Sequence, residues 1–367
     1  MAGSSYGNIF RGTTWGESHG KGLGVVVDGV PAGLELCEED IQIFLNRRKP
    51  GQSKFTTPRK EDDAVEILSG VFEGKTTGTP IAMMVRNTDQ RSKDYSAIMD
   101  VYRPGHADYT FDEKYGFRDY RGGGRSSGRE TIGRVAAGAI AAKLLASLGV
   151  TVTAYARSIG PVEISMERFD LEAASENKVC MPDREAAKEA ESYLEQMLED
   201  QDSVGGVVEC VITGLPAGIG EPVFEKLDAR LAHAEMSIGA VKGVEIGDGF
   251  EAAKAVGSVN NDDFCRNADG TIGKRTNHSG GILGGMSDGS PIVLRAAFKP
   301  TPSISRPQQT VNRAGEEVET VIKGRHDPII VPRAVVVVET MAAFTAADLM
   351  LQNAVAKLDN VRKVYER

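Results

Sequence analysis

The chain has 367 residues, of which 41% are hydrophobic and 26% charged, and its formal net charge is −9 at pH 7. This composition is typical of a globular protein with a sizeable core, and the acidic balance argues against a general nucleic-acid binder. The four cysteines show no metal-ligand spacing, which favours reduced thiols in the cytoplasm.

The ends and the apolar runs of the chain exclude further classes. The first residues, MAGSSYGNIF, contain no charged segment followed by an apolar run, so we expect no signal peptide. No apolar run appears long enough to span a bilayer, so we expect no membrane partner. No break in composition forces two domains, and we therefore expect a single domain over residues 1–367.

The charge is unevenly distributed along the chain. Residues 161–202 hold 13 acidic and 4 basic residues, which predicts an acidic surface segment and leaves the remaining chain close to neutral. Basic residues cluster at 47–60 and 118–134. Local basic clusters in a neutral body indicate pockets for a small anionic ligand rather than a surface for a polyanion.

The first motif is Gly16-Glu17-Ser18-His19-Gly20, which precedes an apolar run over 23–29 that predicts a strand ending in a turn. A single histidine is more often structural than catalytic. The flanking glycines and the neighbouring hydroxyl group keep a catalytic role for His19 equally open.

A helical pattern over 38–48 ends at a Pro-Gly pair. Arg47 and Arg48 lie at this helix end, where they are better placed to serve a site than the basic residues that follow. Strands are expected over 65–68 and 80–85. His106 directly follows another Pro-Gly turn, which makes it a candidate proton donor, again with a structural role left open.

The stretch from 118 to 148 joins a loop rich in glycine and arginine to an alanine-rich helix expected over 131–148. Ser127 and Glu130 have the spacing of a capping box at the junction. Glycines allow close approach of a ligand to the backbone, and the start of the new helix attracts anions. Five arginines fall within 17 residues: Arg118, Arg121, Arg125, Arg129 and Arg134. An anion site is favoured over a solvated loop, although the loop does not identify the anion.

The second half repeats loop, strand and helix units without a nucleotide-binding fingerprint or a metal-ligand cluster. The expected strands cover 150–158, 205–213, 291–298 and 334–339. The expected helices cover 184–199, 224–236 and 341–357, and 260–276 is expected to be a polar loop. Because strands do not alternate regularly with helices, the fold class is expected to be α+β with antiparallel sheets.

Several motifs, taken together and in order, resemble the chorismate synthase family. They are G-E-S-H-G, R-R-K-P-G, R-P-G-H-A-D, G-G-R-S-S-G-R-E-T-I-G-R-V-A-A-G, A-V-K-G-V-E-I-G, N-H-S-G-G-I-L-G-G, K-P-T-P-S and G-R-H-D-P. The resemblance implies a β-α-β sandwich with long helices between two antiparallel sheets, and a homotetramer. It also implies conversion of 5-enolpyruvylshikimate 3-phosphate to chorismate and phosphate, with reduced FMN as cofactor and no metal.

The resemblance also assigns residues. Those implied to bind FMN are Arg125, Ser126, Ser127, Gly239, Ala240, Gly284, Lys299, Pro300, Thr301, Pro302, Ser303 and Arg325. Those implied to bind the substrate or NADPH are Arg47, Arg48, Lys54, Arg129 and Arg134. His19 is implied to protonate the departing phosphate, His106 to stabilise the reduced flavin, and Asp327 to help take the C6 proton, through the flavin. Ser18 and Ser127 are implied proton relays.

The implied chemistry agrees with the residue types. Phosphate leaves from C3 and hydrogen from C6, which no carbonyl acidifies, so a side-chain base alone is a weak catalyst and electron donation from a flavin is needed. A substrate with one phosphate and two carboxylates requires many arginines. Two alternatives stay open: a non-catalytic flavin- or anion-binding protein, and a flavin oxidoreductase with a separate nicotinamide site.

Overall fold

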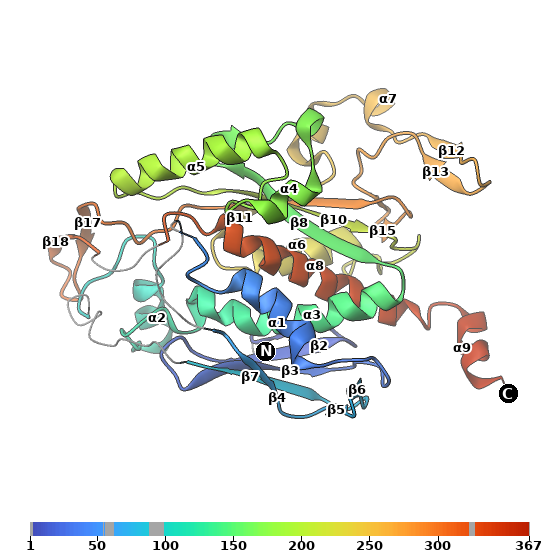
Figure 1. Ribbon diagram of the computed structural model, residues 1–367, viewed down its shortest axis with the longest axis horizontal. Helices are drawn as coiled ribbons and strands as arrows, with labels where there is room; N and C mark the ends of the chain where they lie inside the picture. The colour runs from blue at the N-terminus through green and yellow to red at the C-terminus, as the bar shows by residue number, and fades with distance from the viewer. Residues whose placement is uncertain (1–2, 54, 56–61, 88–98, 323–326, 367) are drawn as a thin grey trace.

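The computed structural model describes residues 3–53, 55, 62–87, 99–322 and 327–366. Figure 1 shows two sheets with helices lying between them. Each large sheet has five strands, and the strand pairs are antiparallel, which confirms the expected α+β class with antiparallel sheets.

The first sheet has the order β1-β2-β3-β7-β4. Its strands are β1 (Ser5–Tyr6), β2 (Arg11–Gly16), β3 (Gly22–Asp28), β7 (Ile81–Arg86) and β4 (Val65–Ile67). Along β7, the buried Ile81, Met83 and Val85 alternate with less buried neighbours. This period of two turns one face of the sheet toward the helices.

The second sheet has the order β11-β16-β10-β8-β9. Its strands are β11 (Val241–Ile246), β16 (Ile292–Phe298), β10 (Gly206–Thr213), β8 (Thr151–Ile159) and β9 (Val162–Glu163). In β16, Ile292, Leu294 and Ala296 are fully buried and alternate with half-buried residues. The expected strands over 150–158, 205–213 and 291–298 are therefore confirmed.

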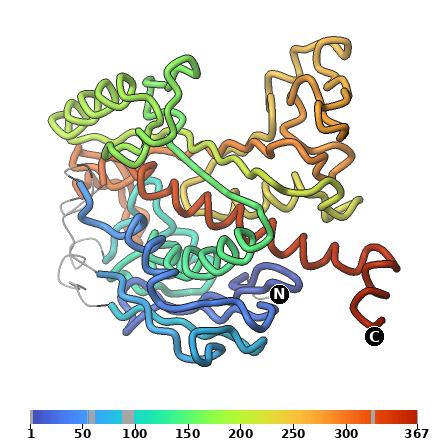
Figure 2. Tube along the Cα trace, turned by 45° about the vertical axis from the view of Figure 1, so that its right-hand side comes forward, coloured from blue at the N-terminus to red at the C-terminus, as the bar shows by residue number. Residues whose placement is uncertain are grey.

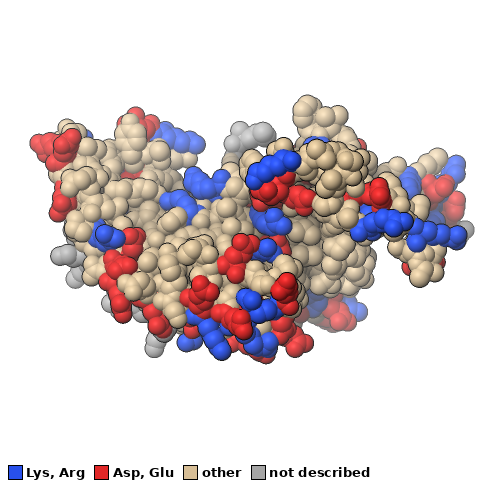
Figure 3. Space-filling model, turned by 90° about the horizontal axis from the view of Figure 1, so that it is seen from above, with Lys and Arg blue, Asp and Glu red and all other residues tan. Residues whose placement is uncertain are grey.

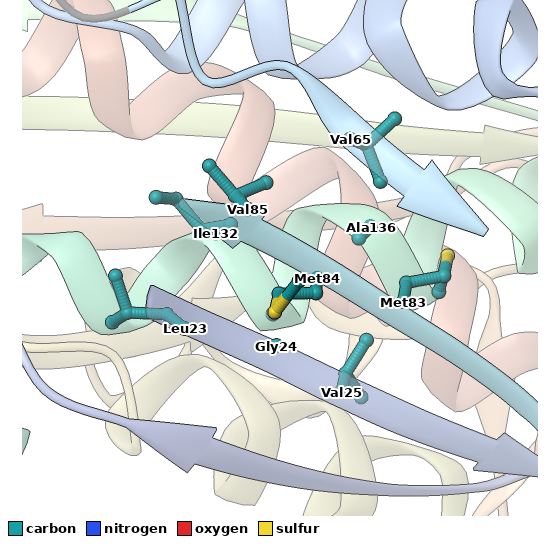
Figure 4. A pocket seen from close by; sticks show the side chains of 10 residues that line it. Leu23, Gly24, Val25, Val65, Met83, Met84, Val85, Ile132 and Ala136 are labelled. Carbon is teal, nitrogen blue, oxygen red and sulfur yellow. The ribbon is translucent and has the colours of Figure 1, made fainter. Parts of the chain in front are cut away.

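Two long helices form the centre of the layer between the sheets. They are α3 (Thr131–Ser147), which packs on β2 and β3, and α8 (Val331–Asn353), which packs on β8 and β10. Figure 4 shows Ile132 and Ala136 of α3 among apolar side chains of β3 and β7. The helices α3 and α8 approach closely at Gly138, where an added Cβ would lie 2.3 Å from the Thr340 carbonyl oxygen.

The expected strand over 334–339 is wrong, because these residues belong to α8. The run of valines suggested a strand, but α8 is buried on all sides, so its sequence carries no helical periodicity. The expectation that no apolar run is long enough to span a bilayer is also wrong. By length and composition alone α8 could cross a membrane, since it has 23 residues and a mean hydropathy of 1.8. However, 89% of its most apolar window is buried inside the protein, as in a core helix.

The other helices are α1 (Glu38–Arg48), α2 (Asp108–Tyr115), α4 (Leu171–Glu176), α5 (Arg184–Glu199), α6 (Leu227–Met236), α7 (Gly257–Asn260) and α9 (Leu358–Tyr365). The expected bounds of α1 and α5 are confirmed, whereas α2 lies where no element was expected. Asp108 stabilises the start of α2 because its negative charge faces the helix N-terminus, and Gly116 ends the helix in the left-handed conformation. α9 extends away from the body and buries none of its residues (Figure 2).

The remaining strands form hairpins: β5 (Val71–Phe72) with β6 (Lys75–Thr76), β12 (Phe264–Arg266) with β13 (Ile272–Lys274), β14 (Ile282–Leu283) with β15 (Met286–Ser287), and β17 (Gln308–Val311) with β18 (Glu317–Thr320). The hairpin β12–β13 lies where a polar loop was expected. On the face shown in Figure 3, acidic and basic side chains are interspersed with wide uncharged areas.

Candidate functional site

The N-terminal ends of α3 and α8 meet the C-terminal end of α1. Arg48, the last residue of α1, donates from Nε to Thr131 Oγ1 at 3.0 Å. Its backbone carbonyl accepts from Nε of Arg333, in the first turn of α8, at 3.0 Å. The partial positive charges of two helix N-termini and the partial negative charge of one C-terminus therefore fall on the same region, and the balance favours an anion there.

A buried carboxylate joins two of the arginines that the sequence singled out. Asp63 Oδ2 accepts from Arg48 Nη1 at 2.6 Å, and Asp63 Oδ1 accepts from Arg129 Nη1 at 3.2 Å. All three side chains are buried. Burial lowers the pKa of Arg48 to about 10, Asp63 opposes this, and the nearby Arg333 and Arg129 lower it further. Sequence reasoning missed Asp63, because nothing in its neighbourhood distinguishes it from other acidic residues.

Asp327 lies beside this cluster and is held by Arg333, whose Nη1 is 2.6 Å from Asp327 Oδ2. The Asp327 side chain is 12% exposed. Arg48, Arg129 and Arg333 thus carry three positive charges against the two carboxylates of Asp63 and Asp327. Arg333 was also missed by sequence reasoning. Lys54 and Arg325, two of the predicted binding residues, lie outside the described residues.

The loop that carries Ser18 and His19 lies against the loop rich in glycine and arginine. An added Cβ on Gly122 would come 2.4 Å from Nδ1 of His19, so only glycine fits there. The buried Ser18 has its Oγ 3.2 Å from the same nitrogen. The structure therefore places these two loops, which both carry predicted site residues, side by side.

Asn87 connects this histidine loop to the arginine cluster. Its Nδ2 donates to the carbonyl groups of Glu17 and Gly20, at 2.9 and 2.8 Å. Its Oδ1 accepts from Arg129 Nε at 3.0 Å. Sequence reasoning missed Asn87 as well.

The junction at the start of α3 forms only half of the expected capping box. Ser127 Oγ accepts from the backbone N–H of Arg129 at 3.3 Å, at the start of a short 3-10 turn over Gly128–Glu130. The carboxylate of Glu130 pairs with Arg134 instead, at 2.7 Å. An i,i+4 ion pair has replaced the second bond of the box.

The five arginines of this stretch are all engaged by the protein itself. Arg118 pairs with Asp112, Arg121 with Asp119, Arg129 with Asp63 and Arg134 with Glu130. Arg125 instead crosses β2, donating to the Gly16 carbonyl at 3.1 Å and to Thr14 Oγ1 at 2.6 Å. An anionic ligand would therefore compete with existing partners rather than meet free guanidinium groups.

His106 lies in a second group of predicted residues. Its Nδ1 donates to the Pro104 carbonyl at 3.0 Å, so its Nε2 accepts from Ser303 Oγ at 2.8 Å. Burial, followed by the nearby Arg103, lowers the pKa of His106 to about 4. The imidazole is therefore neutral at pH 7.

The segment 299–303 completes this second group. Lys299 donates from Nζ to the Gly105 carbonyl at 3.2 Å and from its backbone N–H to the Ala240 carbonyl at 3.0 Å. Arg134 connects the group to α3, since its Nη1 donates to Ser237 Oγ at 2.6 Å, two residues before Gly239. The structure therefore brings His106, Ala240 and 299–303 together across long separations, and their role in binding stays a prediction.

This second group fits a phosphate-bearing polar cofactor. The hydroxyl group of Thr301 is buried, and no hydrogen-bond partner for it lies among the described residues. Gly239 faces open space, as do Gly124 and Gly128 of the arginine loop, so their backbones are accessible. Lys299 supplies a cation, and in the arginine loop the side chain of Ser126 is exposed. A donor set of backbone N–H groups, hydroxyl groups and a lysine suits phosphate.

Two predicted residues lie apart from these groups. Arg47 forms a bidentate pair with Glu339 of α8, at 2.6 and 2.8 Å. Gly284 lies in the β14–β15 turn next to the start of α6, whereas Gly239 and Ala240 follow the end of α6. The ten residues of α6 rise roughly 15 Å, so within a single chain Gly284 lies about that far from the end of α6 that contacts 299–303. No group of three potential metal ligands occurs within the described ranges.

Comparison with known proteins gives one consistent result. The family model for chorismate synthase matches residues 10–351. The chain is 71% identical to the chorismate synthase of Agathobacter rectalis and 67% identical to that of Lachnoclostridium phytofermentans, covering 100% of each chain in both cases. A solved structure described as a crystal structure of chorismate synthase matches with a TM-score of 0.77 and 34% identity, covering 98% of this chain and 97% of the other.

Proposed function

Because the chain belongs to the chorismate synthase family, we propose that it is a lyase that eliminates phosphate from 5-enolpyruvylshikimate 3-phosphate to give chorismate. This anti-1,4-elimination is a step of the shikimate pathway of aromatic amino-acid biosynthesis. The observation that carries the proposal within the structure is the convergence of three arginines, two carboxylates and two helix N-termini at one end of the helical layer.

The substrate anions are proposed to bind at this convergence. Arg48 and Arg129 supply positive charge there, and the start of α3 supplies oriented backbone N–H groups. Arg134 is also proposed as a substrate ligand, although it would have to leave Glu130 and Ser237 to reach the anion. Lys54 belongs to the same proposal, as a ligand of substrate or NADPH. Arg47 has weaker support, because it would have to leave Glu339 to reach an anion.

Reduced FMN, when bound, would supply the transient electron donation that the elimination needs. The residues proposed to hold it are Arg125, Ser126, Ser127, Gly239, Ala240, 299–303 and Arg325. Support comes from the accessible Gly239 backbone, the buried Thr301 hydroxyl group and the closeness of Lys299 to His106. Gly284 has the weakest support, because it lies at the other end of α6.

Four side chains are proposed to handle protons. His19, with Ser18 as relay, donates a proton to the departing phosphate. Asp327 helps to take the C6 proton, and Ser127 is a second candidate relay. His106 is proposed to serve the cofactor as a neutral ring rather than as an imidazolium acid, since its pKa is lowered to about 4, chiefly by burial. A hydrogen bond between its Nε2 and the cofactor would replace the one from Ser303.

The chain is further proposed to act as one domain in a cytoplasmic homotetramer with the β-α-β sandwich of the family. A continuous buried core that includes residues of both sheets supports the single domain. The acidic segment 161–202 is proposed to lie at its surface, supported by α5, which buries Ala186, Ala190 and Leu194 and exposes most of its charges. Exposed apolar side chains such as Phe224 and Phe250 support association with further copies.

An anaerobic assay with chemically reduced FMN tests the proposal. We expect chorismate absorbance to appear with reduced FMN, to be absent with oxidised FMN alone, and to survive metal chelation. Binding of FMN and substrate without product would instead indicate a non-catalytic flavin-binding protein. Oxidation of NADPH without chorismate would indicate a flavin oxidoreductase.

A further inference from the structure

We infer that Asp63 is a positioning residue that fixes the orientation of the Arg129 and Arg48 guanidinium groups toward the substrate anions. The inference rests on the proposed function, because it takes these two arginines as substrate ligands. Asp63 itself would not touch the substrate, since its two oxygens already face the two arginines.

The geometry leaves the three groups little freedom. Asp63 is 3% exposed and adopts the left-handed region with φ of +46°, which few residues other than glycine, asparagine and aspartate adopt. Such conformations persist where the surroundings enforce them and are often found at functional sites. Arg48 is further fixed by Thr131 Oγ1 and by the Gly128 carbonyl, at 3.0 and 2.9 Å.

The charge balance explains why one carboxylate serves two arginines. A buried cation without a counter-charge is strongly unfavourable, so two adjacent guanidinium groups need a carboxylate between them. One carboxylate neutralises only one of them. Within the described side chains of this cluster, two guanidinium groups thus face the one carboxylate of Asp63, an arrangement to which an anionic substrate can add a second negative charge.

The network also couples the arginines to the histidine loop. Arg129 donates hydrogen bonds to Asp63 and to Asn87. Asn87 in turn donates to the carbonyl groups of Glu17 and Gly20, which flank Ser18 and His19. A shift of Arg129 would therefore also displace the proposed proton donor. Asn87 acts in the same positioning network.

The test is Asp63→Asn, which preserves shape and removes the charge. We expect kcat/KM to fall about 10- to 100-fold, the range for losing a charge-assisted hydrogen bond. Competitive inhibition by inorganic phosphate should persist, because both arginines stay in place. A purely structural role would leave the kinetics of the folded fraction unchanged, and that result would overturn the inference.

Two further variants keep the test decisive. Asp183→Asn is the matched control, since Asp183 is also fully buried and paired with an arginine, Arg168, but lies in the acidic segment. The thermal midpoint of this variant should fall, whereas its kcat/KM should stay unchanged. If Asp63→Asn does not fold, Asn87→Ser should still lower kcat/KM at least about fivefold, and unchanged kinetics would refute the network. A wild type that makes no chorismate would refute the proposed function instead.

Discussion

The Nε2 atom of His106 lies 2.8 Å from the Oγ atom of Ser303, although 197 residues separate them in the chain. The N–H group at Nδ1 donates to the Pro104 carbonyl, so in the neutral ring Nε2 carries no hydrogen and accepts the bond from Ser303. This contact joins a turn after a Pro-Gly pair to the segment 299–303. A ligand seated between them would meet a fixed imidazole rather than a mobile one.

The first prediction concerns pH. The pKa of His106 is lowered from 6.5 to about 4, chiefly by burial. A lowered histidine pKa contributes stability that is fully present above pH 6.5 and is lost as pH falls from 6.5 toward 4, because the unfolded state takes up the proton first. Denaturant titrations at several pH values should show this loss in the wild type and a smaller loss in His106→Gln. Identical slopes for the two proteins would contradict it.

The second prediction concerns Arg125. Arg125→Ala should weaken FMN binding by about 1.5–3 kcal/mol, the range for a hydrogen bond to a charged group. It should also lower the thermal midpoint, because Arg125 bonds to the Gly16 carbonyl and Thr14 of β2. Flavin titration and thermal unfolding measure the two effects. Arg121→Ala is the control, since Arg121 is half exposed and pairs with Asp119 in the same loop. Equal FMN affinity in both variants would refute the proposed contact.

The third prediction concerns Asp327. Asp327→Asn keeps the shape of the side chain and removes its basicity, so turnover under saturating substrate and reduced FMN should fall about 10²–10⁴-fold. The thermal midpoint should stay near that of the wild type, because Asn can still accept from Arg333. Asp119→Asn, at an exposed pair, should retain normal turnover. Near-normal turnover of Asp327→Asn would show that another group takes the proton.

The fourth prediction concerns the contact between the two central helices. Gly138→Ala would place a Cβ 2.3 Å from the Thr340 carbonyl oxygen, so α3 and α8 would have to move apart. We expect a loss of about 1–3 kcal/mol in the free energy of unfolding, as for other overpacked cores. Gly257→Ala, whose Cβ meets nothing within 4 Å, should change stability little. Denaturant unfolding that shows equal stability for both variants would rule out the close contact.

The sequence by itself determined the elements that have one face in the core and one outside. The helices α1 and α5 follow from apolar residues repeated at helical spacing, whereas the strands β7, β10 and β16 follow from short apolar runs rich in β-branched residues or bounded by turns. The ordered motifs also determined the family, and they placed His19, His106 and 299–303 among the candidate site residues.

Tertiary structure alone decided the rest. The helix α8 is surrounded by protein, so burial on every side removed the periodicity that would have marked it as one helix. Asp63, Asn87 and Arg333 take their importance from partners distant in sequence, and a local pattern cannot encode such contacts. The separation of Gly284 from Gly239 is likewise set by the length of α6, because one lies near the start of this helix and the other follows its end.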